Sequence, residues 1–369
     1  MNEQSRRRRG PMAAAVAASL ALALSGCGPA ITTGAEGVDA GTCAPEDIFL
    51  VDSGRGLQNE YYVAVEAGAK AFAEEMGMLD QYQWISSDGD SSKQLSQIKA
   101  ILAKHGHCTV LNIDANESSI VPALVHEVES YGAWLVTQWN KPDGSSPLTS
   151  SPHWVAHMSV NGVPQGYETA KALFEEMGGE GSVVVLQGIL DNPPAKERFE
   201  GFQMALEEYP GIEMIENQTA GWDRTEAQNI TETWITAHGD EIGGVWSAGD
   251  DMALGAREAL LNAGIEAPVT GVDGLSQAQQ LVAEGSGSLY VATTQSTGVL
   301  QGAYGLAIAY AAATGEVDPA SLPPEQREFY LEDLPVVTRE NVNTIRDAMD
   351  TTFLEFEDPW QYAGDPITD

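Results

Sequence analysis

The chain of 369 residues carries 54 Asp and Glu residues against 18 Lys and Arg residues, which gives a formal net charge of −36. Such a surface repels phosphate groups, so nucleic acid is excluded as a partner. The acidic residues are spread along predicted helix faces, which favours a solvated surface over a site for a cationic partner. At this length one hydrophobic core stops growing, and two domains are expected.

The chain begins with the three parts of an export signal in their required order. Residues 6–9 are arginines, residues 13–24 form an apolar run too short to span a bilayer, and Leu-Ser-Gly-Cys occupies residues 24–27. The tetrad resembles the lipobox of bacterial lipoproteins, which implies a signal peptide at residues 1–26 and a lipid on Cys27. The alternative is an ordinary cleaved signal with an incidental cysteine. Residues 27–45 are expected to be a lipid-anchored tether outside the cytoplasm.

Short β-rich runs then alternate with amphipathic helical patterns, which predicts an α/β fold with parallel sheets. Before a Pro, Ser and Gly-rich loop at residues 142–152, strands are expected at residues 48–51, 82–85, 110–113 and 134–137, and helices at residues 61–76, 92–104 and 118–131. After the loop, helices are expected at residues 163–177, 195–209, 224–237, 252–263, 277–283 and 298–313, and strands at residues 182–186, 212–216, 244–247, 269–272 and 289–293. The acidic end after Arg339 is expected to hold a short helix and an irregular tail. The pattern predicts two Rossmann-like lobes in series.

Two further cysteines, Cys43 and Cys108, each lie just ahead of a predicted strand. If those strands are neighbours in a parallel sheet, their N-terminal ends lie close enough for a structural disulfide, which an oxidising compartment permits. Two separate buried thiols are the alternative.

Ligands of open parallel sheets bind beyond the carboxyl ends of the strands. The residues that follow the predicted strands there are rich in aromatic, amide and charged side chains, at residues 52–55, 59–62, 112–114, 139–140, 187–188, 191–192, 222–224, 249–251 and 273–274. This mixture suits a sugar, because a sugar ring offers apolar C–H faces to aromatic rings and hydroxyls to paired donors and acceptors. Plainer interpretations remain open: Tyr61, Trp139 and Trp222 as core aromatics, Asp223 and Asp250 as helix N-caps, and Arg198 as a surface charge.

Several ordered segments resemble the sugar-binding proteins of bacterial ABC importers, which share the periplasmic binding protein type I fold with ribose-binding protein. They include Asn-Glu-Tyr-Tyr at residues 59–62, Trp-Asp-Arg at residues 222–224 and Gly-Val-Asp-Gly at residues 271–274, with further matches at residues 186–188, 196–202 and 250–256. The resemblance implies a two-lobed receptor that closes on a ligand. The ligand-binding residues it implies, together with those at strand ends, are Asn59, Tyr61, Tyr62, Asn112, Trp139, Asn140, Arg198, Trp222, Asp250, Asp273 and Gln295.

This chain departs from the family pattern at two positions where the family recognises the hydroxyls of its ligand. The frequent Asp-Arg pair after the fourth strand is Trp139 and Asn140 here, and the frequent Asn of the segment before Met252 is Gly249. These departures make ribose itself doubtful and favour a different sugar or polyol.

The resemblance also implies a hinge of three segments, near residues 156–159, 294–296 and 325–328. The N-terminal lobe is then expected at residues 46–156 and 296–325, the C-terminal lobe at residues 157–295 and 326–345, and an acidic tail at residues 346–369. The expected function is capture of a sugar or polyol and delivery to an ABC permease by a monomer that needs no cofactor and no metal and is not an enzyme. A sugar-sensing receptor that feeds a signalling partner and a lipoprotein glycosidase are the rival interpretations.

Overall fold

The computed structural model describes residues 42–332 and 334–368. The predicted signal peptide, Cys27 and nearly all of the tether lie outside the described residues. Within the described part, no helix combines the length and the apolar character that a membrane crossing requires.

The first lobe is built on a seven-stranded sheet with the strand order β13-β11-β5-β4-β3-β1-β2. Its strands are parallel except for β13, which pairs antiparallel with β11. The strands are β1 (Phe49–Gly54), β2 (Tyr82–Ser86), β3 (Thr109–Asp114), β4 (Trp134–Gln138), β5 (Trp154–Ser159), β11 (Glu328–Leu331) and β13 (Ala363–Pro366). The helices of this lobe are α1 (Glu60–Glu75), α2 (Ser91–His105), α3 (Val121–Tyr131), α9 (Gly298–Thr314) and α10 (Pro324–Arg327).

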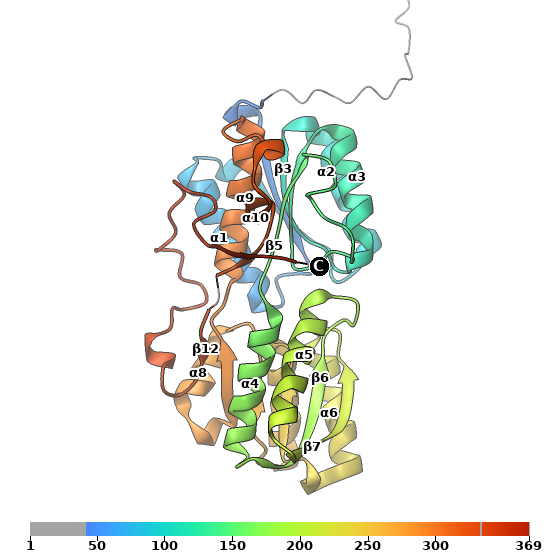
Figure 1. Ribbon diagram of the computed structural model, residues 1–369, viewed down its shortest axis with the longest axis vertical. Coiled ribbons are helices and arrows are strands. Elements are labelled where there is room, and N and C mark those ends of the chain that lie inside the picture. Colours follow the sequence, from blue (N-terminus) through green and yellow to red (C-terminus); the bar gives the residue numbers. More distant parts are fainter. Residues whose placement is uncertain (1–41, 333, 369) are drawn as a thin grey trace, which may run out of the picture. The chain divides into compact units, whose positions relative to one another are not determined.

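The second lobe holds a six-stranded sheet with the order β12-β10-β9-β8-β6-β7, in which only β12 is antiparallel to its neighbour. The strands are β6 (Glu180–Gln187), β7 (Gly211–Thr219), β8 (Gly244–Ser247), β9 (Val269–Thr270), β10 (Tyr290–Thr294) and β12 (Val336–Val337). The helices are α4 (Gly162–Glu176), α5 (Pro193–Glu208), α6 (Arg224–His238), α7 (Asp250–Ala263) and α8 (Ser276–Glu284). Figure 1 shows the two sheets in separate lobes, with α4 leading from one lobe into the other.

Local sequence explains where several helices begin. Asn59, Asp90, Asn161 and Asp223 precede helices, and the side chain of each accepts a hydrogen bond from a backbone N–H of the first turn. The N-cap interpretation of Asp223 is therefore confirmed. The central strands β3 and β4 are buried along their whole length, which explains why their sequences are mostly apolar.

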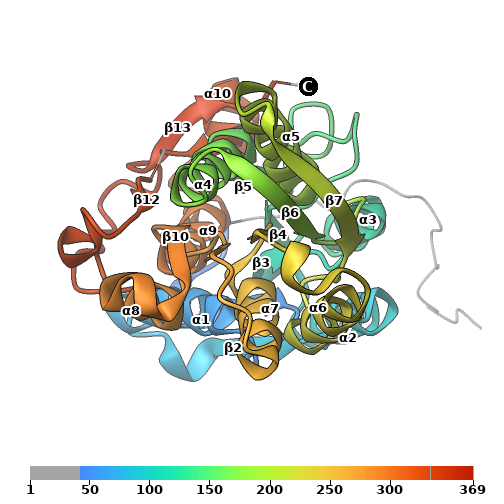
Figure 2. The same cartoon turned by 90° about the horizontal axis from the view of Figure 1, so that it is seen from below.

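Helices α4 and α5 lie side by side at very close range, as do α6 and α7 (Figure 2). A Cβ atom placed on Gly166 of α4 would lie only 1.9 Å from the carbonyl oxygen of Arg198 on α5. Glycine is required there because the two backbones touch, and this contact sets the depth at which α5 presents Arg198.

Cys43 and Cys108 form a disulfide, with their Cα atoms 5.7 Å apart. The two residues lie at the N-terminal ends of β1 and β3, which are adjacent and parallel. The disulfide is therefore at the opposite end of the strands from their carboxyl ends, which confirms the pairing and its structural position.

The lobe boundaries differ from the expectation in two places. Residues 157–159 stay in the first lobe because β5 pairs with β4, and residues 328–331 join the same sheet because β11 pairs with β5. The segment expected to belong to the second lobe from residue 326 therefore enters that lobe only near β12. Four strands were not predicted: β5, which follows closely after the Pro, Ser and Gly-rich loop, and the short strands β11, β12 and β13.

The acidic end of the chain, residues 338–368, is largely irregular, as expected, but the expected short helix is only a 3-10 turn at Val342–Thr344, and the segment ends in strand β13. We call this segment the strap. Arg339 first forms a bidentate ion pair with Glu176 on α4 of the second lobe. The chain then returns to the first lobe, where Phe356 packs on Phe72 and Tyr304 and β13 completes the edge of the sheet. The strap thus adds a connection between the lobes beyond the three that were expected.

Candidate functional site

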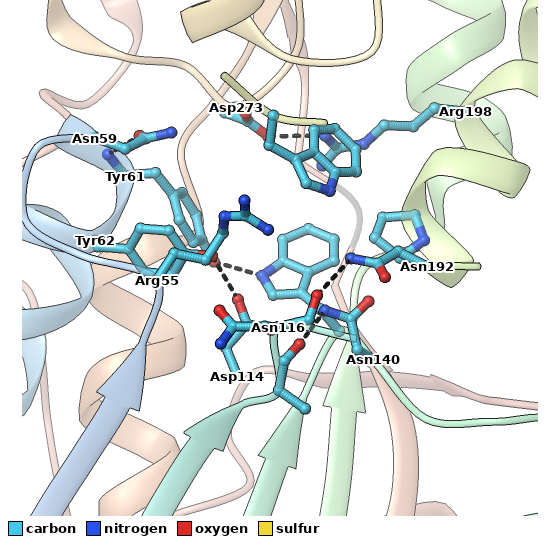
Figure 3. Close-up of a pocket in the computed structure, with 14 residues that line it drawn as sticks. Arg55, Asn59, Tyr61, Tyr62, Asp114, Asn116, Asn140, Asn192, Arg198 and Asp273 are labelled. Carbon is cyan, nitrogen blue, oxygen red and sulfur yellow. Dashed lines mark hydrogen bonds and ion pairs between the residues drawn. The ribbon is translucent and has the colours of Figure 1, made fainter. Parts of the chain in front are cut away.

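A cavity of about 60 Å³ lies between the carboxyl ends of the strands of the two lobes. Most of the predicted binding residues line it, namely Asn59, Tyr61, Tyr62, Trp139, Asn140, Arg198, Trp222 and Asp273. Figure 3 shows Asn59, Tyr61, Tyr62 and Asn140 of the first lobe converging with Arg198 and Asp273 of the second lobe. The strand-end rule therefore predicted which side chains meet at this cavity.

Asn112, Asp250 and Gln295 do not line this cavity. Asn112 is buried on β3 and donates to the Asp52 carboxylate and to the Gln301 carbonyl. Asp250 is buried at the start of α7, where it accepts hydrogen bonds from Tyr290, Thr293 and the backbone of Leu275. The Gln295 backbone N–H donates to Pro335 in the hinge. Their type and position suggested ligand contact, but Asn112 Nδ2 and the Asp250 carboxylate are bonded to groups of their own lobes instead.

Six lining residues were not among the chosen binding residues, and four of them are polar or charged: Arg55, Asp114, Asn116 and Asn192. Arg55 directly follows β1 and Asp114 ends β3, so the strand-end rule includes both. Asn192 precedes α5 as its N-cap residue but makes no side-chain capping bond, which leaves its amide for other contacts. That property is visible only in the folded chain.

The first lobe presents an aromatic wall whose polar atoms are already bonded within the protein. Trp139 Nε1 donates to the Tyr61 hydroxyl at 2.7 Å, and that hydroxyl also bonds the Gln301 side chain. The Tyr62 hydroxyl donates to Asp114 Oδ2 at 2.8 Å. The rings of these three aromatic residues are buried, so this wall offers carbon rather than free polar groups to a ligand.

The second lobe contributes a charged pair beneath an indole. Arg198 is 3% exposed; its Nη1 lies 2.9 Å from Asp273 Oδ1 and donates to the Ala248 carbonyl at 2.7 Å. The guanidinium carbon lies 5.1 Å from the centre of the Trp139 ring and 5.8 Å from that of Trp222, so the cation lies against two aromatic rings. Arg198 is therefore not the solvated surface charge that was its plainer interpretation.

Backbone strain is concentrated at this cavity. Trp139, Trp222 and Asp273 have φ angles of 55°, 65° and 114°, in the region that non-glycine residues rarely adopt. Gly188 makes the Trp222 position possible, because a Cβ atom at residue 188 would lie 2.0 Å from the indole. Strain held at a cavity by surrounding packing is typical of a functional site.

Several buried polar atoms of lining residues have no hydrogen-bond partner among the described residues. They are Arg55 Nη1, Asn140 Oδ1, Asn192 Oδ1 and Arg198 Nε. Asn140 and Asn192 are 4% and 2% exposed. The Asn140 amide orientation is fixed, since its Nδ2 donates to the Asp114 carboxylate and the Ala115 carbonyl. Unpaired groups of this kind are costly, so a ligand that supplies their partners gains affinity.

The charges of the cavity come close to cancelling. Arg198 is balanced by Asp273, whose pKa is raised by burial and lowered again by Arg198. Burial raises the pKa of Asp114 to about 7, while the Tyr62 hydroxyl and Arg55 act against that rise. The arrangement favours a neutral ligand over an anion or a cation.

Hydrogen bonds cross directly between the lobes at the edges of the cavity. Arg55 Nη2 donates to the Gly221 carbonyl at 3.2 Å, and Ser118 Oγ donates to the Asp191 carbonyl at 3.1 Å. At another edge, the Ser276 backbone N–H donates to Glu60 at 3.1 Å. The structure therefore shows the closed arrangement of the lobes.

Within the described part of the chain, one group of residues has the spacing of metal ligands: Cys43, His107 and Cys108. Both sulfur atoms of that group are in the disulfide, so it offers no thiolate to a metal.

The periplasmic binding protein domain family matches residues 53–316. Xylitol-binding protein of Mycolicibacterium smegmatis is 28% identical over 280 residues, covering 71% of this chain and 77% of that protein. Ribose import binding protein RbsB of Salmonella typhimurium is 27% identical over 288 residues, covering 78% and 91%. The crystal structure of a twin-arginine translocation pathway signal protein from Burkholderia phytofirmans is 36% identical and superposes with a TM-score of 0.82, covering 87% of this chain and 98% of that one. The chain belongs to the periplasmic binding protein family.

Proposed function

We propose that this protein captures a neutral sugar or polyol between its lobes and delivers it to an ABC permease. The proposal has the support of relatives named for binding xylitol and ribose, which align over most of this chain. It also agrees with a cavity that lies where ligands of open α/β sheets bind.

One observation carries the proposal: aromatic rings and unpaired buried polar atoms face the same cavity. Carbon faces of Tyr61, Tyr62 and Trp139 can cover the C–H face of a sugar or polyol, while the free atoms of Asn140 and Asn192 can accept from its hydroxyls. The balanced charges oppose anionic ligands such as phosphates. A hydroxylated neutral molecule satisfies all three conditions.

Closure of the two lobes explains how a permease can distinguish the ligand-bound protein from the ligand-free one. A ligand that contacts Asn140 of the first lobe and Arg198 of the second lobe stabilises the closed arrangement relative to the open one. The closed surface is then what the permease recognises. No covalent step is required, and we propose that the protein works as a monomeric receptor and not as an enzyme.

We further propose that the lipid on Cys27 and the tether up to residue 45 hold the receptor at the membrane, where a permease can be reached. The test of this location is metabolic labelling with a radioactive fatty acid. Label is expected in the wild type and absent from Cys27→Ser, and label retained by Cys27→Ser would contradict the anchor.

A thermal-shift panel tests the binding function. Pentoses, hexoses, polyols, disaccharides, nucleosides and amino acids are compared, and a ligand that binds the closed form should raise the melting temperature. Trp222→Ala and Asp273→Ala are expected to abolish the shift while the protein stays folded, whereas Asp240→Ala, at an exposed site, should keep it. A shift produced by amino acids or nucleosides alone would reject the sugar and polyol class.

A further inference from the structure

The carboxylate of Glu60 lies at the N-termini of two helices that belong to different lobes. Glu60 is the first residue of α1 in the first lobe. Its Oε1 accepts a hydrogen bond of 3.1 Å from the backbone N–H of Ser276, the first residue of α8 in the second lobe. Figure 1 shows these two helices in separate lobes. Movement of the lobes away from each other must therefore break this contact.

Helix α8 has no side-chain cap from its own N-cap residue. That residue is Leu275, whose apolar side chain makes no capping hydrogen bond. The N–H groups of the first turn of a helix lack acceptors within the helix, and this end of the helix carries a partial positive charge. The Glu60 carboxylate supplies both the acceptor and the negative charge. It therefore does for α8 what an Asp or Ser at the N-cap position does for other helices.

Glu60 and Ser276 do not line the cavity, but residues close to them in sequence do. Asn59 and Tyr61 flank Glu60, and Asp273 precedes Ser276 by three residues. We infer that Glu60 is an interlobe cap: it caps α8 only in the closed arrangement and thereby strengthens ligand binding without contacting the ligand. This inference rests on the proposed function. Glu60 is then a positioning residue, and it changes the affinity for every ligand by the same factor.

A repulsion between the lobes opposes this attraction. Burial raises the pKa of Asp251 on α7 to about 6; Arg224 acts against this rise, and Glu60 is the weakest of the acidic residues that add to it. Arg224 Nη1 also lies 3.7 Å from Asp251 Oδ1 and offsets part of its charge. The repulsion is therefore smaller than the direct hydrogen bond to α8. Loss of Glu60 removes both effects, whereas loss of the Ser276 N–H leaves the repulsion in place.

Two substitutions remove the interlobe hydrogen bond, one from each lobe. Glu60→Ala deletes the acceptor, and Glu74→Ala, at an exposed site on the same helix, is its control. Ser276→Pro deletes the donor, and proline is favoured at the first position of a helix. Leu275, with φ of −59° and ψ of 144°, already has the conformation that a residue before proline adopts. Ser276→Ala is the matched control, because it loses only the side-chain hydroxyl and keeps the backbone N–H.

Calorimetric titration with xylitol, D-ribose and the other sugars and polyols of the panel measures the effect on affinity. Every compound that binds the wild type should bind Glu60→Ala about fivefold more weakly, and Ser276→Pro at least as weakly, by one factor for all compounds. The double variant should bind as Glu60→Ala does, because the second change has no hydrogen bond left to remove. Both control variants should bind as the wild type does.

Small-angle X-ray scattering measures closure without a ligand. The hydrogen bond between the lobes favours the closed arrangement whether or not a ligand is bound. The radius of gyration of the ligand-free protein should therefore be larger in Glu60→Ala and Ser276→Pro than in the wild type and in the two control variants.

The possible results separate this inference from the proposed function. If no sugar or polyol binds the wild type, the proposed function is wrong, and the radii of gyration alone decide the inference: equal radii reject it. If compounds bind and Glu60→Ala and Ser276→Pro keep the wild-type affinity, the function stands and the interlobe cap is wrong. Losses that add up in the double variant, or that differ between compounds, also reject the cap, because they indicate separate effects or direct ligand contact. A uniform loss that is no greater in the double variant supports it.

Discussion

Arg198 Nη1 and Asp273 Oδ1 lie 2.9 Å apart and join helix α5 to the loop that follows β9. The same Nη1 also donates to the Ala248 carbonyl. One guanidinium thereby links three segments of the second lobe and balances the negative charge of Asp273. Its Nε still has no hydrogen-bond partner among the described residues.

Replacement of Arg198 by lysine is expected to weaken ligand binding by about tenfold or more. A lysine ammonium is compact, and it cannot reach Asp273 and Ala248 while also offering a separate donor in the plane of a guanidinium. Calorimetric titration with the compound that gives the largest thermal shift measures the loss. Arg224→Lys, with the side chain 44% exposed, is the control and should bind normally. Unchanged affinity in Arg198→Lys would show that the Arg198 guanidinium does not contribute to ligand binding.

Gly166→Ala is expected to lower both stability and ligand affinity. The added Cβ would meet the carbonyl oxygen of Arg198 at 1.9 Å, so α5 must move away and take Arg198 with it. A cost of about 1–3 kcal/mol in the free energy of unfolding is expected from such overpacking. Urea denaturation and calorimetric titration measure the two effects. Gly287→Ala, where no heavy atom lies within 4 Å, should change neither, and normal affinity in Gly166→Ala would show that the helix contact does not position Arg198.

Asp250 is expected to make the stability of the protein depend on pH. Burial, followed by repulsion from Asp273, raises the pKa of Asp250 from 3.8 to about 8. The folded state therefore keeps a proton that the unfolded chain has released, so stability falls as pH rises between about 4 and 8 and levels off above that range. Asp250→Asn lacks this contribution because it is neutral at every pH.

Urea denaturation at a series of pH values measures this effect. The free energy of unfolding of the wild type, relative to that of Asp250→Asn, should fall by up to about 1.4 kcal/mol for each pH unit in this range. Asp240→Asn, at an exposed site, should follow the wild type and so account for the general effect of net charge. A difference between wild type and Asp250→Asn that is constant with pH would contradict the assignment.

Phe356→Ala is expected to destabilise the first lobe by about 2 kcal/mol. The Phe356 ring centre lies 5.3 Å from that of Phe72 and 5.9 Å from that of Tyr304, so the strap covers the outer side of α1 and α9 through this residue. Urea denaturation measures the change. Leu261→Ala, at a side chain that is 44% exposed, should cost less than about 0.5 kcal/mol. An equally small effect of Phe356→Ala would show that the contact of the strap with the first lobe contributes little to the free energy of unfolding.

Much of the site could be predicted because its positions follow from strand order. Tyr61, Trp139, Trp222 and Asp273 come after predicted strands, and the carboxyl ends of parallel strands meet at one edge of a sheet. Asp250 obeys the same rule but is buried beneath the cavity, since Tyr290 and Thr293 on β10 reach its carboxylate. A position after a strand is visible in the sequence, whereas the depth of a side chain depends on which strand lies next to it.

The element pattern, the excess of acidic charge and the types of side chain at the strand ends all follow from the order of residues along the chain, and so does the prediction of a signal peptide at residues 1–26. The folded chain alone decides which polar atoms remain free for a ligand. Tyr61 meets Trp139, and Arg55 meets Gly221, across long separations in sequence. Local pattern carries no information about such pairs, because hydrogen bonds form between groups that packing brings together, and packing joins β11 and the strap to the first lobe in the same way.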